Sequence, residues 1–417
     1  MACGRCDCGS AHFGRDVRYF PVPMAVIKAL LKGFKMKLWF GFMLLFSSLV
    51  QAAELPLVQK QQLELAHFTT QSGVALKQVK VGWEAYGTLN ADKSNVILIT
   101  HYFSGTSHAA GKYRSTDAAP GYWDKIIGPG KAIDTNTFYV LSVDSLANLN
   151  AFSPDVITTG PASINPDTGK AYGLSFPVVT IRDFVEVQKA LLDKLGIEKL
   201  YAVIGPSMGS FQAIEWAVSY PDKVERLLPV IGTAYIDSFS AIRLERWAQP
   251  IKQDIAWNKG VYPLTQQPEG LTRALAYVIQ DALHPDLFNQ SYPAPALNSA
   301  IHQDIQAELP AWNQLMSTAK QRSAQMDANS LLYLVRASQL WRAGMGDNWQ
   351  EKLKNVKAKT LWLPATGDLL LTPTMAKHSK EQMSGAGYEE ISGQAGHLDG
   401  LLNIQSKTEQ IRLFLAD

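Results

Sequence analysis

Cysteine is almost absent from this chain. The 417 residues contain only three, Cys3, Cys6 and Cys8, and no histidine or cysteine cluster follows them at a spacing suited to a metal. From position 9 onward the sequence therefore offers no disulfide, no thiolate-rich metal site and no cysteine nucleophile.

An excess of charge of one sign is also missing. The 39 lysines and arginines nearly balance the 37 aspartates and glutamates, giving a formal net charge of +2. This balance gives no reason to expect nucleic acid as a partner. Phosphate loops and dinucleotide fingerprints are absent too, so the sequence implies no cofactor and no metal.

The apolar run near the N-terminus is too short to span a bilayer comfortably. Leu38–Val50 follows two lysines and ends in small residues, the pattern of a secretory signal peptide. We expect a signal peptide at 36–53, cleaved near Ala52 or Ala53, and a periplasmic or secreted protein without stable membrane insertion; a retained anchor is the weaker alternative. Residues 1–35 are expected not to belong to the natural mature protein.

One stretch, residues 200–220, organises the rest of the sequence. A short apolar run leads into Gly205-Pro206-Ser207-Met208-Gly209, and apolar residues then recur at helical spacing. A strand, a tight G-x-S-x-G turn and a helix form the context of a nucleophile elbow, in which Ser207 is exposed at the edge of a sheet. The alternative is an ordinary strand-to-helix turn whose serine caps the helix.

The order of the expected elements defines the fold class. Strands alternate with helices, which predicts an α/β-hydrolase fold with a mostly parallel, doubly wound sheet. Residues 54–233 and 357–417 are expected to form its core, and 234–356 a helical lid whose tryptophans pack within it. The expected strands cover 79–86, 96–100, 138–143, 227–231, 360–364 and 388–391, and the expected lid helices 271–283, 302–309 and 329–343.

A serine nucleophile needs a base, and the base needs an acid to orient it. In α/β-hydrolases the chain order is serine, acid, histidine. Asp368 follows the strand at 360–364, and His397 follows the strand at 388–391, so both are expected at the sheet edge that carries Ser207. Asp237, which follows an earlier strand, is the reserve acid.

The loop after the early strand 96–100 is expected to complete an oxyanion hole. We predict two backbone N–H donors, from Met208 after the nucleophile and from Phe103 in the loop. His101 and His108 flank this loop, and we expect that either can line the site.

From about residue 79 onward the chain resembles the homoserine O-acetyltransferase family of α/β-hydrolases. The resemblance is densest between Thr159 and Thr233, with TGPASINPDTGKAYG, FPVVTIRDFVEVQKALLDKLGI and GPSMGSFQAIEWAVSYPDKV in family-like order. It implies acyl transfer through an acyl-serine, with Ser207, Asp368 and His397 at the triad positions.

Two polar positions of that family differ here. The family holds its amino-acid substrate with a lid arginine, but the matching residue is Leu275, and Arg273 points elsewhere on a helix. The family also has aspartate directly after the triad histidine, where this chain has Leu398, with Asp399 one residue later. Losing such anchors changes specificity and leaves the reacting groups in place.

We therefore expect a serine hydrolase acting on a carboxylic ester through an acyl-serine. The first alternative is a homoserine O-acetyltransferase or a related acyltransferase, using a donor such as acetyl-CoA. The second is a non-catalytic secreted binding protein on a hydrolase scaffold. The expected partner is a small-molecule ester or acyl donor, and a homodimer through the lid is an open possibility.

Overall fold

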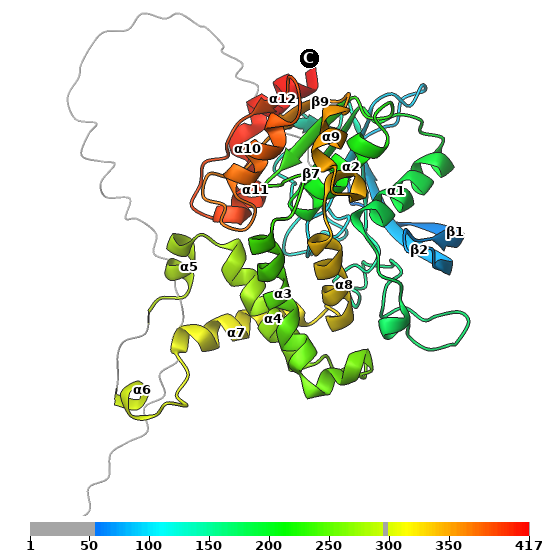
Figure 1. Ribbon diagram of the computed structural model, residues 1–417. Helices are drawn as coiled ribbons and strands as arrows, with labels where there is room; N and C mark the ends of the chain where they lie inside the picture. The colour runs from blue at the N-terminus through cyan, green and yellow to red at the C-terminus, as the bar shows by residue number, and fades with distance from the viewer. Residues whose placement is uncertain (1–54, 295–298, 417) are drawn as a thin grey trace, which may run out of the picture. The chain divides into compact units, whose positions relative to one another are not determined.

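The computed structural model describes residues 55–294 and 299–416 (Figure 1). The predicted signal peptide at 36–53 and the segment 1–35 lie outside the described residues. Within the described part, none of the helices has the length and apolar character needed to cross a membrane.

A sheet of eight strands forms the centre, in the order β1-β2-β6-β3-β7-β8-β9-β10. The β1, β2 and β6 strands pair antiparallel, and every neighbouring pair from β6 to β10 is parallel. This confirms the expected mostly parallel sheet. The strands are β1 (Gln61–Thr69), β2 (Ala75–Tyr86), β3 (Val96–Thr100), β6 (Tyr139–Val143), β7 (Ala202–Pro206), β8 (Arg226–Val230), β9 (Lys359–Trp362) and β10 (Gly387–Tyr388), with a separate pair β4 (Ile127–Gly128) and β5 (Ile133–Asp134).

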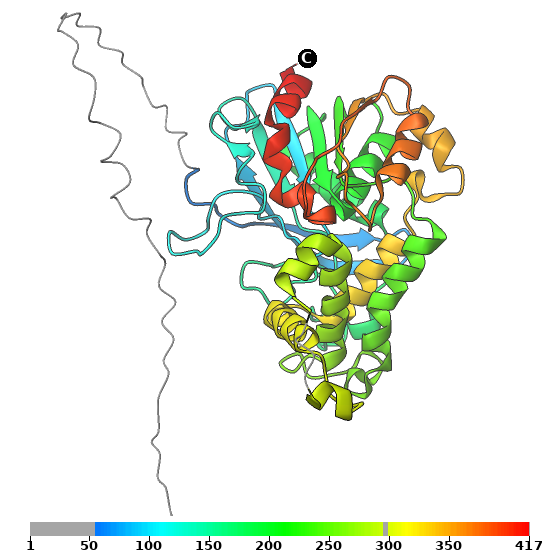
Figure 2. The same ribbon diagram turned by 90° about the vertical axis from the view of Figure 1, so that its left-hand side faces the viewer.

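Both faces of the central strands are buried, which explains their uninterrupted apolar sequences. Alternate residues enter two different clusters: Leu98 packs on one face, and Ile97 and Ile99 pack on the other. Helices α1 (Ile181–Leu195) and α2 (Met208–Ser219) contribute to the first cluster, whereas α12 (Thr408–Ala416) covers the second (Figure 2).

Helix α1 is capped at both ends. Thr180 and Asp183 form a reciprocal capping box, and Gly196 ends the helix in the left-handed conformation, at φ 65°. The helix after the nucleophile turn, α2, is buried along most of its length. Two short helices, α10 (Pro373–Glu381) and α11 (Asp399–Leu402), complete the core.

Of the helices between β8 and β9, the last lies with the core near β9, whereas the others form an insertion on one side of the core in both views (Figures 1 and 2). Its two ends lie side by side, because Ile236 N–H donates to the Trp341 carbonyl at 3.0 Å and Ala343 N–H to the Ala234 carbonyl at 2.9 Å. The helices are α3 (Ser238–Gln253), α4 (Glu269–Ala282), α5 (Pro285–Ser291), α6 (Ser299–Gln303), α7 (Pro310–Ser323), α8 (Ala328–Gln339) and α9 (Trp349–Lys354).

The expected helix at 302–309 is wrong. Helix α6 ends at Gln303, and α7 starts only at Pro310. Proline suits the first turn of a helix but disfavours helical geometry in the residue before it. Pro310 therefore starts a new helix and does not prolong the preceding one.

Candidate active site

Ser207 occupies a strained turn between β7 and α2. Its backbone has φ 57° and ψ −123°, a conformation that residues other than glycine rarely adopt. The flanking glycines make room for it: a Cβ on Gly205 would lie 2.1 Å from Thr100 Oγ1, and one on Gly209 would lie 2.1 Å from the Thr100 carbonyl oxygen. Strand and helix thus approach as closely as a nucleophile elbow requires.

The structure brings Ser207, His397 and Asp368 into one hydrogen-bonded chain. Ser207 Oγ lies 2.7 Å from His397 Nε2, and His397 Nδ1 lies 2.6 Å from Asp368 Oδ2. All three residues are buried. The arrangement allows the imidazole to take the serine proton while the carboxylate holds the opposite ring nitrogen.

The second oxygen of Asp368 is held by the backbone. Oδ1 accepts hydrogen bonds from the N–H groups of Leu370 at 2.8 Å and Leu371 at 3.0 Å. The carboxylate therefore cannot rotate without leaving two donors unpaired, and Oδ2 stays directed at His397. Asp237, the reserve acid, instead caps α3 by accepting from Ser240 N–H at 2.8 Å.

In the loop that follows β3, called the first loop below, the His101 side chain fixes the peptide group between Tyr102 and Phe103. Its Nε2 accepts from Ser145 N–H at 2.9 Å, so the proton is on Nδ1, which donates to the Tyr102 carbonyl at 2.8 Å. Burial lowers the pKa of His101, which keeps the ring neutral and preserves this tautomer. Gly105 N–H also donates to the Tyr102 carbonyl, at 2.9 Å.

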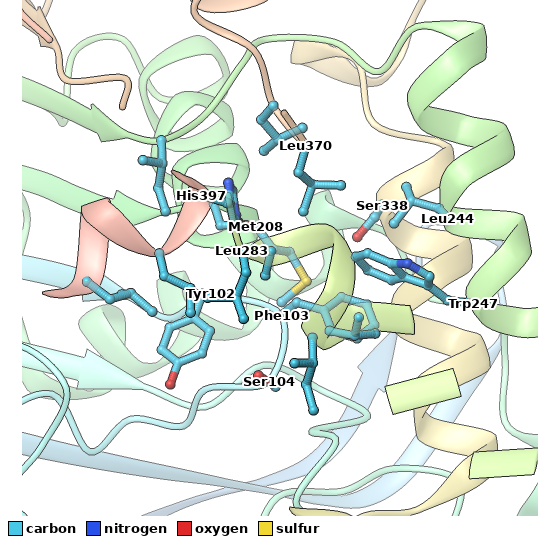
Figure 3. A pocket seen from close by; sticks show the side chains of 18 of the residues that line it. Tyr102, Phe103, Ser104, Met208, Leu244, Trp247, Leu283, Ser338, Leu370 and His397 are labelled. Atoms are coloured by element: carbon cyan, nitrogen blue, oxygen red, sulfur yellow. Dashed lines mark hydrogen bonds between the residues drawn. The ribbon is translucent and has the colours of Figure 1, made fainter. Parts of the chain in front are cut away.

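In a trans peptide the N–H points opposite to the C=O. Because His101 holds the Tyr102 carbonyl on one side, the N–H of Phe103 faces the other side. Within the described residues no acceptor is found for the N–H of Phe103 or of Met208. Both residues line the same cavity as Ser207 (Figure 3).

His108 does not line the cavity and belongs to a buried charged cluster beside the loop. Glu84 is fully buried and contacts Lys60 at 2.9 Å and His108 at 3.0 Å. Tyr86 donates to the same carboxylate at 2.8 Å, and the Tyr113 hydroxyl is a further donor to it. The cluster reaches the loop because Ser107 Oγ contacts Glu84 at 3.2 Å.

This cluster makes stability depend on pH. Burial alone would raise the pKa of Glu84, but His108 and Lys60 outweigh it and lower that pKa from 4.5 to about 2. A lowered carboxyl pKa stabilises the fold above pH 4.5, and this contribution is lost as the pH falls towards 2. The shift corresponds to about 3 kcal/mol at neutral pH.

We therefore expect Glu84→Gln to lose about 3 kcal/mol of unfolding free energy at neutral pH, and much less near pH 3. Urea unfolding at both pH values measures this. Glu198→Gln, at an exposed glutamate, is the control and should change neither value. Equal losses for Glu84→Gln at the two pH values would contradict the assignment.

Ser207 opens into a cavity of about 370 Å³, most of whose lining is apolar. Trp247, Leu283, Leu370 and Phe103 surround it (Figure 3), and Leu398 lines it beside His397. Trp247 is an exception to the expectation that the lid tryptophans only pack within the lid. It lies on α3, packs edge-on against Phe103 with ring centroids 5.5 Å apart, and faces the cavity.

The charged residues nearest the two altered family positions, Arg273 and Asp399, do not reach this cavity. Leu275 is buried in the apolar core, and Arg273 is exposed and paired with Glu269 at 3.0 Å. Asp399 turns back into its own loop, where its carboxylate accepts from Ala395 N–H at 3.1 Å. The sequence differences are thus not compensated by these neighbours.

Comparison with known proteins places the site in a family. The α/β-hydrolase fold family matches residues 150–403. Homoserine O-acetyltransferase from Methanococcoides burtonii is 36% identical over 343 residues, 79% of this chain and 68% of that protein. The crystal structure of homoserine O-acetyltransferase from Bacillus anthracis is 35% identical with a TM-score of 0.84, covering 87% of this chain and 98% of the other.

Another solved structure, that of esterase E22, is 56% identical with a TM-score of 0.84, covering 86% of this chain and all of the other. Taken together, the matches define a member of the α/β-hydrolase class. The chain belongs to the homoserine O-acetyltransferase family within that class, in agreement with the predicted resemblance.

Proposed function

We propose that this protein is a serine-dependent acyl-transfer enzyme that hydrolyses a carboxylic ester. The observation that carries the proposal is the hydrogen-bonded chain from Ser207 through His397 to Asp368, on the floor of an apolar cavity. In this proposal Ser207 is the nucleophile, His397 the general base and then the general acid, and Asp368 the residue that orients it.

The reaction proceeds in two halves. His397 Nε2 takes the proton as Ser207 Oγ attacks the ester carbonyl, whose oxygen becomes negative and accepts from the N–H groups of Met208 and Phe103. The alcohol leaves with the proton from His397, which produces an acyl-serine. A water molecule, deprotonated by His397, then attacks this intermediate, and the acid is released as Ser207 regains its proton.

Two observations support water as the acyl acceptor. Leu275 and Leu398 stand where the family places charged groups for its amino-acid substrate, and neither Arg273 nor Asp399 replaces them at the cavity. A solved structure at 56% identity is also that of an esterase. Because no aspartate or glutamate lines the cavity within the described residues, the ammonium group of homoserine finds no partner there, and the site discriminates against this acceptor.

The second candidate is transfer of an acyl group to homoserine, which the names of the curated relatives favour. To separate the two, purified protein is given short p-nitrophenyl esters and, separately, acetyl-CoA with homoserine. Ester hydrolysis without O-acetylhomoserine supports our proposal; transfer to homoserine without ester hydrolysis reverses it. Labelling of Ser207 by a fluorophosphonate probe is expected in both cases and excludes a binding-only scaffold.

His101 is expected to act as a positioning residue for the oxyanion hole. His101→Ala removes one of the two donors that hold the Tyr102 carbonyl and should lower kcat by up to about 10²-fold, the usual loss for one oxyanion donor, with little change in KM. His101→Asn keeps a donor near the position of Nδ1 and should restore most of kcat. If both variants lose activity only in proportion to their melting temperatures, the role of His101 is structural.

Export from the cytoplasm is part of the proposal and is supported by the signal-peptide pattern at 36–53 alone. An exported enzyme has no ready supply of cytosolic acetyl-CoA. The localisation therefore favours hydrolysis over transfer from that donor.

A further inference from the structure

The cavity above Ser207 contains one permanently charged side chain, that of Arg322. Arg322 lies in the last turn of α7 and is exposed, so it stands where the cavity meets solvent. No aspartate or glutamate lines the cavity within the described residues. The positive charge of Arg322 is therefore not neutralised from inside the site.

Other arginines of the lid differ in this respect. Arg246 contacts Asp281 at 2.6 Å, and Arg273 contacts Glu269 at 3.0 Å. In the described part of the chain, Arg322 has neither an ion-pair nor a hydrogen-bond partner. An arginine without a protein partner keeps all five N–H donors available for a ligand.

Two tyrosines line the same cavity. Tyr102 belongs to the first loop, and Tyr292 follows α5. Neither hydroxyl has a hydrogen-bond partner among the described residues, although Tyr292 is only 7% exposed. Burial raises the pKa of Tyr102 and the charge of Arg322 counteracts this, so the two groups interact across the cavity.

We propose that Arg322, together with the hydroxyls of Tyr102 and Tyr292, binds a carboxylate group carried by the ester substrate. This inference rests on the proposed function, since it names the substrate class of the same site. The ester group lies at Ser207, apolar atoms fill the lining around Trp247 and Leu283, and the carboxylate reaches Arg322. A planar guanidinium suits a carboxylate because it donates two parallel hydrogen bonds.

The test uses two pairs of esters, each with a neutral and a carboxylate member. p-Nitrophenyl pentanoate and p-nitrophenyl hemisuccinate place the charge on the acyl side, whereas phenyl acetate and meta-carboxyphenyl acetate place it on the alcohol side. In at least one of the two pairs, the wild-type kcat/KM should be at least about tenfold higher for the carboxylate member than for the neutral member. This is the effect of one charge-assisted contact. Added salt should reduce this preference.

Arg322→Gln should reduce the ratio of kcat/KM between the carboxylate member and the neutral member of that pair to about one. Lys320→Gln is the matched control: it lies on the same helix, removes the same charge and does not line the cavity. It should keep the preference. A wild-type enzyme without a preference in either pair, or a preference that survives in Arg322→Gln, would overturn the inference.

A binding measurement separates this inference from the proposed function. Calorimetry on Ser207→Ala, titrated with meta-hydroxybenzoate and with neutral meta-hydroxybenzamide, needs no catalysis. Tighter binding of the anion that is lost in the additional Arg322→Gln variant supports the subsite. Equal binding of the two compounds overturns it, even if esters are hydrolysed; absence of ester hydrolysis with selective anion binding contradicts only the proposed function.

Discussion

Ser207→Ala is expected to lower kcat for ester hydrolysis by about 10⁶-fold, close to loss of the whole triad, because its members act as a unit. The variant lacks the oxygen that forms the acyl intermediate, but the cavity and the oxyanion donors remain. Ester binding should therefore persist while turnover and fluorophosphonate labelling disappear. Stopped-flow assays with p-nitrophenyl esters and mass spectrometry of the labelled protein measure both effects.

The strained backbone at Ser207 does not complicate this test, because alanine occupies the same conformation at a similar cost. Ser210→Ala is the matched control: Ser210 lies one turn away, and its hydroxyl donates only to the Ser207 carbonyl at 2.6 Å. It should keep most of the activity. Labelled protein in Ser207→Ala would show that another side chain is the nucleophile.

Asp368→Asn is expected to lower kcat by about 10⁴-fold with little change in the unfolding free energy. The reason is that Asp368 Oδ1 accepts from the N–H groups of Leu370 and Leu371, and both groups still need an acceptor in the variant. The asparagine oxygen will satisfy them, so its NH₂ group faces His397 Nδ1. That nitrogen must then be unprotonated, and the proton moves to Nε2, which can no longer accept from Ser207.

This variant makes a specific prediction for pH as well. Alkaline solution should recover part of the activity, since hydroxide can replace the missing base, whereas the wild type gains nothing comparable. NMR of the imidazole protons would detect the change of tautomer directly. Wild-type kcat in Asp368→Asn would contradict the role assigned to the carboxylate.

The sequence predicted the fold and the triad of this molecule better than the residues that line its cavity. Buried strands such as 96–100 and the capped helix that follows Thr180 have local signals, namely continuous apolar runs and cap residues. The positions of Ser207, Asp368 and His397, each after a different strand of the parallel sheet, predicted one shared edge, because parallel strands end on the same side. The structure brings the three side chains together there.

The cavity-lining residues of the lid and the orientation of His101 could not be predicted, because they depend on contacts between segments that are distant in the sequence. Arg322 and Trp247 lie on different helices and come to the same cavity only through folding of the lid, so no motif marks them as cavity residues. His101 was expected to be able to line the site, but it is buried behind the loop and acts on a peptide group. Its position at the start of the loop after strand 96–100 gave no indication of which way its ring would face.

The paired ends of the lid have a consequence for how selectivity changes. Residues 234–236 and 341–343 are joined by backbone hydrogen bonds, and the strands on either side, β8 and β9, are neighbours in the sheet. The whole inserted segment is thus attached through a narrow stalk. Exchange of that segment between relatives would replace Trp247 and Arg322 together while leaving Ser207, Asp368 and His397 on the parent scaffold, so bond cleavage and substrate choice can diverge independently.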